Sequence, residues 1–235
     1  MARIGLTIMS SPKRYILGSR SPRRQELLRL VVPQEQIAVI PPANSVEAGF
    51  EGLHDLSSIE TRLLEIARVK GEDVLRQVRA GVLGEVAAPE TVLITADTTV
   101  AVPHPEGMGR YLSLGQPPED DSWPDVVRDW FIRLYAGQTH LVLSALHLQT
   151  LSGRETIRLV HTSVTFRRDV ERWLDWYLAT GELRGKARGY GIQGLASIFV
   201  TRVEGSLSNV VGLPLEALSG ALQELGVGDG KDIAH

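Results

Sequence analysis

The sequence contains no cysteine, and this absence removes several classes of protein at once. Without thiols the chain has no disulfide scaffold, no thiolate nucleophile and no cysteine-bound zinc or iron–sulfur site. A strong charge of either sign is also missing, because 25 Lys and Arg stand against 28 Asp and Glu, for a net charge of −3. This balance gives no global attraction to nucleic acid or to an anionic membrane, although a local basic patch still could.

No stretch of the sequence is apolar enough for a targeting signal or a membrane span. Ile4–Met9 is a short apolar run before Lys13 and Arg14, and a secretory signal needs a longer one. The uncharged segment Ala136–Gly153 is interrupted by polar side chains, whereas a membrane helix needs roughly 20 predominantly apolar residues. We therefore expect a soluble, cytoplasmic protein with no membrane partner.

The composition and the hydrophobic periodicity predict an α/β protein. The chain has 235 residues, of which 43% are hydrophobic and 23% charged, as in ordinary globular proteins. Runs rich in β-branched residues predict strands over 14–18, 36–41, 91–102, 139–150, 156–165 and 197–203. Helical spacing predicts helices over 22–31, from 58 to a loop at 81–89, and over 123–136, 169–180 and 213–225. Hairpins coexist with strand–helix units, so we expect one domain over 1–235 with a mixed sheet, and frayed tails at 1–13 and 226–235.

The segment Gly18–Arg24 is the first candidate binding site. A short strand, a loop of small residues and a helix capped by Ser21 place backbone N–H groups and the positive end of a helix dipole at one point. Three guanidinium groups lie beside it, on Arg20, Arg23 and Arg24, and guanidinium pairs with phosphate oxygens bidentately. The pattern suits a phosphate chain, while a solvated helix start and contact with a nucleic-acid backbone remain alternatives.

Asp97 is the second candidate, in an otherwise apolar β-branched run. We expect its carboxylate to leave the sheet at a strand end, where ligand crevices of α/β sheets often open. Such a carboxylate could hold Mg²⁺ together with phosphate oxygens, or take a proton from water. An aspartate that caps a turn is the alternative. By themselves, Lys70 in a helix and Glu47 in a loop are weaker candidates, because both residue types are usually solvated.

A glycine-rich segment, Lys186–Gly194, is the third candidate. Three glycines within six residues permit positive φ angles and close approach of a ligand. The segment matches neither a Walker-A nor a dinucleotide-binding fingerprint. The sequence also contains no HExxH pair and no G-x-S-x-G elbow, so a zinc protease and a serine hydrolase have little support.

Four motifs follow one another along the chain: Tyr15–Leu28, Ala96–Thr98, Gly185–Gly194 and Gly205–Pro214. Together they resemble the Maf family of nucleoside triphosphate pyrophosphatases, with the Ala-Asp-Thr motif in second place and the C-terminal signature in the last two. The resemblance extends to about Leu218, nearly the whole chain. It implies an elongated, twisted mixed sheet flanked by helices, with two lobes and a central cleft.

The resemblance also implies a reaction and a set of site residues. The reaction is hydrolysis of a nucleoside triphosphate to the monophosphate and pyrophosphate, with Mg²⁺ or Mn²⁺ as the divalent metal. Asp97 matches the proton acceptor, and Glu47 and Asp97 would hold the metal. The positions that would bind substrate are Ser19, Arg23, Arg24, Lys70, Thr98, Lys186 and Gln193. The form Tyr-Gly-Ile-Gln-Gly is that of the dTTP/UTP-hydrolysing branch, and a homodimer is compatible with the resemblance.

Two positions depart from the family pattern. Gln116 stands in Gly-Gln-Pro where the family usually has lysine, and Arg188 stands where a small residue is expected. The first change removes a charge that would neutralise phosphate, and the second would replace it only if the guanidinium points into the cleft. The alternative function is therefore a catalytically weak, nucleotide-binding regulatory protein of the same fold. A nucleic-acid partner is not expected, because the net charge is −3 and the basic patch is confined to one short segment.

Overall fold

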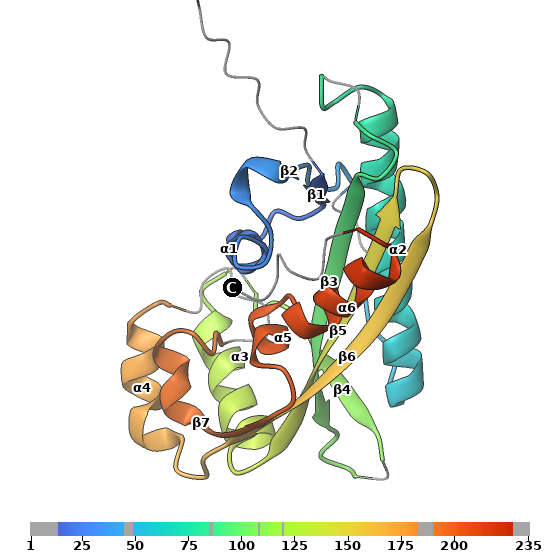
Figure 1. The fold of residues 1–235 in the computed structure, drawn as a ribbon. Coiled ribbons are helices and arrows are strands. Elements are labelled where there is room, and N and C mark those ends of the chain that lie inside the picture. Colours follow the sequence, from blue (N-terminus) through green and yellow to red (C-terminus); the bar gives the residue numbers. More distant parts are fainter. Residues whose placement is uncertain are drawn as a thin grey trace, which may run out of the picture.

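Seven strands form one mixed sheet in the order β2-β1-β3-β5-β6-β7, with β4 paired to β3 beside this path (Figure 1). The computed structural model describes residues 14–44, 49–84, 87–107, 109–118, 120–182 and 190–227. Strands β2, β1 and β3 run parallel, and the other pairs are antiparallel. The predicted mixed sheet is confirmed. The strands are Tyr15–Leu17 (β1), Ile37–Val39 (β2), Val92–Pro103 (β3), Tyr111–Leu114 (β4), Thr139–Thr150 (β5), Glu155–Phe166 (β6) and Val200–Glu204 (β7).

Helices cover both faces of the sheet. The long helix α2 packs on one face, and the other helices pack on the opposite face (Figure 1). No helix among the described residues is long and apolar enough to cross a membrane. The helices are Pro22–Leu28 (α1), Leu56–Arg79 (α2), Trp123–Asp129 (α3), which continues as a π-helix over Trp130–Tyr135, Glu171–Ala179 (α4), Leu207–Val211 (α5) and Leu215–Glu224 (α6), with 3₁₀ turns at Gln34–Gln36 and Leu195–Phe199.

The apolar core on the α1 side is divided by a polar pair. Alternate residues of β3 face this side. Those up to Ala96 pack with α1 and α6, whereas those from Val100 onward pack with α3 and α4. Between them lies Thr98, whose Oγ1 is 2.8 Å from Oγ of Ser144 on β5. This division into two clusters agrees with the two-lobed arrangement that the sequence resemblance implies.

The core on the α2 side is divided at the same place. Leu93 packs with the second half of α2, and Ala101 packs with its first half. Between them, Thr95 Oγ1 donates to a backbone carbonyl of α2 at 2.8 Å, and Asp97 meets Lys70. The middle of β3 is therefore polar on both faces, while both of its ends are apolar.

One predicted element was wrong in detail, and one helix was not predicted. The strand expected over 197–203 begins only at Val200, because the chain first makes a 3₁₀ turn over Leu195–Phe199. The helix expected over 213–225 is confirmed as α6, and the short helix α5 before it was not predicted. Gly212 has φ of 128°, a conformation that ends a helix, and Pro214 precedes α6.

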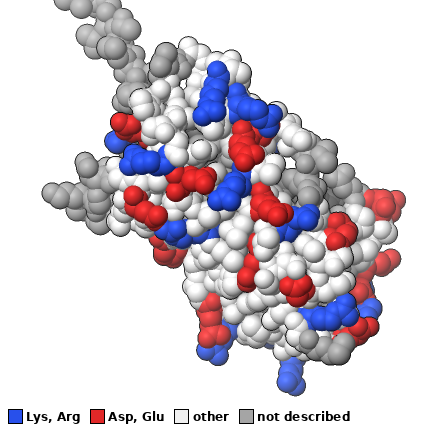
Figure 2. Space-filling model, turned by 90° about the vertical axis from the view of Figure 1, so that its right-hand side faces the viewer, with Lys and Arg blue, Asp and Glu red and all other residues white. Residues whose placement is uncertain are grey.

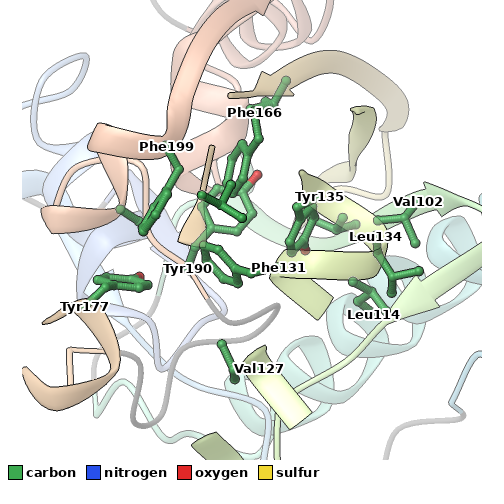
Figure 3. Close-up of a cluster of buried hydrophobic side chains, with 14 of the residues drawn as sticks. Val102, Leu114, Val127, Phe131, Leu134, Tyr135, Phe166, Tyr177, Tyr190 and Phe199 are labelled. Carbon is green, nitrogen blue, oxygen red and sulfur yellow. The ribbon is translucent and has the colours of Figure 1, made fainter. Parts of the chain in front are cut away.

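Aromatic side chains fill the larger apolar cluster (Figure 3), which encloses a histidine. His140 is 1% exposed, and its Nε2 lies 2.7 Å from the Tyr190 hydroxyl. Among the described residues its Nδ1 has no hydrogen-bond partner. Burial lowers the pKa of His140 from its ordinary 6.5 to about 3, because charging the ring in this surrounding is unfavourable. The ring is thus neutral at pH 7.

This neutral histidine predicts an acid-labile fold. Between pH 6.5 and pH 3 the unfolded chain binds a proton at His140 that the folded chain does not. The free energy of unfolding therefore falls as pH decreases, by about 1.4 kcal/mol per pH unit from this group. Denaturant titrations at pH 7, 6 and 5 measure how the free energy of unfolding changes with pH. In His140→Gln this change should be smaller, by about the 1.4 kcal/mol per pH unit that one bound proton contributes. Equal slopes for the two proteins would contradict the assignment.

Candidate functional site

The site lies where the outer edge of β3 has no partner strand. Strand β1 pairs with this edge up to Ile94, and β4 pairs with it only from Val100 onward. Strand β5 occupies the opposite edge continuously through this region. Between Ile94 and Val100, no strand of the described chain pairs with the outer edge. Asp97 is the one residue of this segment that is not buried, and we call this segment the β3 gap.

Asp97 lies in the middle of β3 and not at a strand end, so that expectation was wrong. The β-branched residues after it continue the strand, and β5 pairs with β3 past this point. The edge is unpaired here because β1 pairs only up to Ile94 and β4 only from Val100 onward. Asp97 therefore lies beside an unpaired edge in the middle of a 12-residue strand.

Asp97 forms an ion pair with Lys70. Its Oδ1 lies 2.7 Å from Nζ of Lys70 on α2, and the two side chains are 14% and 13% exposed. The other carboxylate oxygen, Oδ2, has no hydrogen-bond partner among the described residues. Lys70 thus fixes one oxygen of the carboxylate, and the second oxygen remains an acceptor beside the β3 gap.

Arg24 connects three segments on the opposite face of the strand. Helix α1 begins after Ser21, whose side chain accepts from the Arg24 backbone N–H. The Arg24 guanidinium donates from Nε to the Gly212 carbonyl at 2.9 Å and from Nη2 to Thr98 Oγ1 at 3.1 Å. Its Nη1 donates to the buried Ser19 Oγ at 3.5 Å. A planar guanidinium held by these three partners, all among the described residues, has a defined orientation at the gap.

The Gly212 carbonyl reaches Arg24 because of the break between α5 and α6. Gly212 has a φ angle of 128°, a conformation that glycine adopts readily and that is strained for other residues. Just before it, Asn209 is fully buried and donates to the Val142 carbonyl at 3.0 Å and to Thr162 Oγ1 at 3.0 Å. The α5–α6 turn is therefore tied to β5 and β6 directly behind the site.

An apolar groove of about 700 Å³ lies between the α1 segment and α5. Leu27 of α1 and Val31, just after this helix, line the groove, and α5 lines it with Val211, the neighbour of Gly212. Gln193 also lines the groove and is exposed. The segment before Gln193 is anchored by Tyr190, which is 7% exposed and inserted into the aromatic cluster (Figure 3).

The structure brings together five of the predicted site residues around the β3 gap: Lys70 with Asp97, and Ser19, Arg24 and Thr98. Arg23 is half-buried beside Arg24 on α1 and makes no hydrogen bond or ion pair with the described residues. Glu47, Lys186 and Arg188 lie outside the described residues. Gln116 is exposed and follows β4, on the far rim of the gap from β1.

No local pattern around Ser144 indicated a role at the site. Its hydroxyl contacts Thr98 from the adjacent strand, and a single serine in an apolar strand resembles any other strand residue. The pairing of β3 with β5, which places the two residues opposite each other, was the missing information.

A divalent metal fits this site in one specific way. Among the described residues no group of three or more His, Asp or Glu side chains could hold an ion. Mg²⁺, however, is commonly held by one or two carboxylates together with phosphate oxygens of a substrate. Asp97, with its second oxygen available, fits that kind of site.

Comparison with known proteins identifies relatives across almost the whole chain. The profile of the family described as "Maf-like protein" matches residues 14–225. A dTTP/UTP pyrophosphatase of Chelativorans sp. (strain BNC1) is 37% identical over 207 residues, which cover 88% of each chain. One of Caulobacter vibrioides is 35% identical over 224 residues, covering 93% of this chain and 98% of the relative. A solved nucleoside-triphosphatase / dITP/XTP pyrophosphatase of Mycobacterium abscessus aligns with 90% of this chain and 95% of its own at 16% identity, with a TM-score of 0.39.

Proposed function

Because the chain belongs to the family of Maf-like proteins, we propose that it hydrolyses nucleoside triphosphates to the monophosphate and pyrophosphate. We further propose dTTP and UTP as substrates, the nucleotides named for its relatives. The observation that carries the proposal is the β3 gap, with the Lys70–Asp97 pair on one side of the strand and Arg24 on the other. A carboxylate and two cationic side chains at the β3 gap suit the attack of water on a negatively charged triphosphate.

Asp97 is proposed to orient the attacking water and take its proton. One carboxylate oxygen accepts from Lys70 at 2.7 Å, which holds the group in place. The other oxygen can accept a hydrogen bond from water directed at the α-phosphorus. A positioned general base of this kind contributes about 10²–10⁴-fold to a rate.

Cationic groups are proposed to neutralise the phosphates. Attack on a phosphate chain is hindered by its negative charge, so positioning and charge stabilisation dominate catalysis of phosphoryl chemistry. Ser19, Thr98 and the Gly212 carbonyl orient the Arg24 guanidinium, and Arg23, Lys70 and Lys186 are the further candidates. A divalent cation, Mg²⁺ or Mn²⁺, when held by Asp97 and Glu47, would offset charge on the phosphates and the leaving pyrophosphate.

The base is proposed to lie in the apolar groove, where Gln193 reads its edge. Uracil and thymine present N3–H beside carbonyl oxygens, and a glutamine amide can accept from the first and donate to the second. Gln193 lines this groove, and the groove continues to Val211 beside the arginine site. The groove walls are mainly apolar side chains, which suit the flat faces of a base.

This assignment predicts a loss of discrimination when the amide is removed. Gln193→Leu should lower kcat/KM for UTP by about tenfold, since one good edge contact is worth about 1–3 kcal/mol. The change for GTP should be smaller, so the UTP/GTP ratio of kcat/KM falls. Gln223→Leu, an exposed glutamine on α6 that does not line the groove, is the matched control. An unchanged ratio in Gln193→Leu would remove Gln193 from base recognition.

The rival function is a nucleotide-binding regulator with weak catalysis, which Gln116 favours by lacking the usual charge. A panel of dTTP, UTP, CTP, GTP and ATP with Mg²⁺ or Mn²⁺ separates the two, with pyrophosphate and orthophosphate measured separately. The enzyme releases pyrophosphate from dTTP and UTP over many turnovers, whereas the regulator binds them without release. Release of orthophosphate alone would contradict both.

We expect this activity in the cytoplasm and without nucleic acid as a partner. On the face shown in Figure 2, basic and acidic side chains are interspersed and form no large patch of one sign. Basic side chains elsewhere in the described chain also form ion pairs, as in Arg62 with Glu65 and Arg68 with Glu155. A nucleic-acid backbone is bound by continuous positive surface, so this face gives such a partner no support.

A further inference from the structure

The Ser144 side chain is fully buried and carries a hydroxyl. The residues before and after it on the same face of β5 are apolar. Its neighbours on that face of β5 are Val142 and Leu146, which belong to the two different apolar clusters. A buried hydroxyl lowers stability unless it is hydrogen-bonded. The partner that the structure gives it is Thr98 Oγ1, at 2.8 Å, directly opposite on β3.

The directions of the hydrogen bonds follow from Arg24. A guanidinium can only donate, so Thr98 Oγ1 accepts from Arg24 Nη2 at 3.1 Å. Both hydroxyl protons have an acceptor when Ser144 donates to Thr98 Oγ1 and Thr98 donates to the Gly212 carbonyl oxygen. The distance from Thr98 Oγ1 to that oxygen is 3.5 Å. The same carbonyl accepts from Arg24 Nε at 2.9 Å. Ser144, Thr98, Gly212 and Arg24 thus form one connected set of hydrogen bonds.

We propose that Ser144 is a positioning residue, which fixes the Thr98 hydroxyl and through it the plane of the Arg24 guanidinium. Ser144 is fully buried and does not touch the substrate itself. Its effect is to keep Thr98 Oγ1 turned as an acceptor toward Arg24, so that the guanidinium is oriented before the phosphates arrive. The proposal rests on the proposed function in assigning phosphate to Arg24, but the orientation of Arg24 can be measured without substrate.

The test compares Ser144→Ala with Thr150→Val. Thr150 is also fully buried on β5, and its hydroxyl is bonded to Ser152 and Arg154 at the other end of the strand. Ser144→Ala should raise KM for UTP about fivefold with kcat within about twofold, the change expected for loosening one hydrogen bond. Thr150→Val should leave KM unchanged. In ¹⁵N spectra, the Arg24 Nε–H of Ser144→Ala should exchange with water at least about tenfold faster than in the natural protein.

A double mutant separates positioning from a general loss of packing. In the Thr98→Val protein the connection is already broken, so adding Ser144→Ala should change KM by less than about 1.5-fold. Fully multiplicative effects, or an Arg24 Nε–H that exchanges at the natural rate in Ser144→Ala, would overturn the proposal. If Ser144→Ala does not fold, Ser144→Cys, similar in size and a weak donor, is subjected to the same measurements.

The outcome distinguishes this proposal from the proposed function. Should the natural protein release no pyrophosphate from UTP, the function fails, and the exchange measurement on Arg24 still decides the role of Ser144. Should pyrophosphate be released while Arg24 exchange and KM are insensitive to Ser144, the function stands and the positioning role is wrong.

Discussion

Asp97→Asn is expected to lower kcat for UTP by about 10³-fold, within the range for loss of a positioned general base. The asparagine oxygen can still accept from Lys70, so the ion-pair partner keeps a hydrogen bond and the shape of the site is retained. What is lost is the ability to take a proton from water. Binding of a UTP analogue with an imido bridge between the α- and β-phosphates should change by less than about tenfold, since one charge near the phosphates is removed.

The control for this substitution is Asp175→Asn. Asp175 is an exposed carboxylate on α4, paired with Arg128 at 2.6 Å, and takes no part in the β3 gap. Its amide variant should keep the natural kcat. If Asp97→Asn also kept kcat within about threefold of the natural value, Asp97 would not be the base.

Arg24→Ala is expected to have the second largest effect, a loss of kcat/KM of about 10²–10³-fold, equivalent to about 3–4 kcal/mol. The substitution removes three hydrogen bonds that join α1 to Ser19, Thr98 and the Gly212 carbonyl. Arg24→Lys should not restore the activity, because an ammonium group cannot satisfy three partners in one plane.

The matched control is Arg29→Ala. Arg29 is exposed and follows the last turn of the same helix α1. Its removal should leave kcat/KM within about twofold, as for most exposed substitutions. Full activity in Arg24→Lys would show that a positive charge suffices there and that the planar orientation has no role.

Local patterns predicted the elements whose signals lie close together in sequence. The hairpin of β5 and β6 was predicted as the two neighbouring strands over 139–150 and 156–165, and it is confirmed by their pairing. The start of α1 was predicted from Ser21 and Pro22, and the cap is present. In each case the residues that determine the structure are within a few positions of one another.

Long-range features were not predictable in the same way. Asp97 lies beside an unpaired strand edge because of where β1 stops pairing and where β4 begins to pair. Neither of these leaves a mark on the sequence around Asp97. The bond from Arg24 to Gly212 joins residues 188 positions apart. The resemblance to a family supplied Ser19, Arg24 and Thr98 as a group, whereas Ser144, which completes their contacts, was found only through strand register.

Hydrolysis of UTP in H₂¹⁸O tests the central claim most directly, because it reports which phosphorus the water attacks. If Asp97 directs water at the α-phosphorus, the label enters the phosphate of UMP and the pyrophosphate carries none. The rate of labelling should fall in Asp97→Asn by the same factor as kcat. Label in the pyrophosphate or in orthophosphate, with unlabelled UMP, would contradict the account.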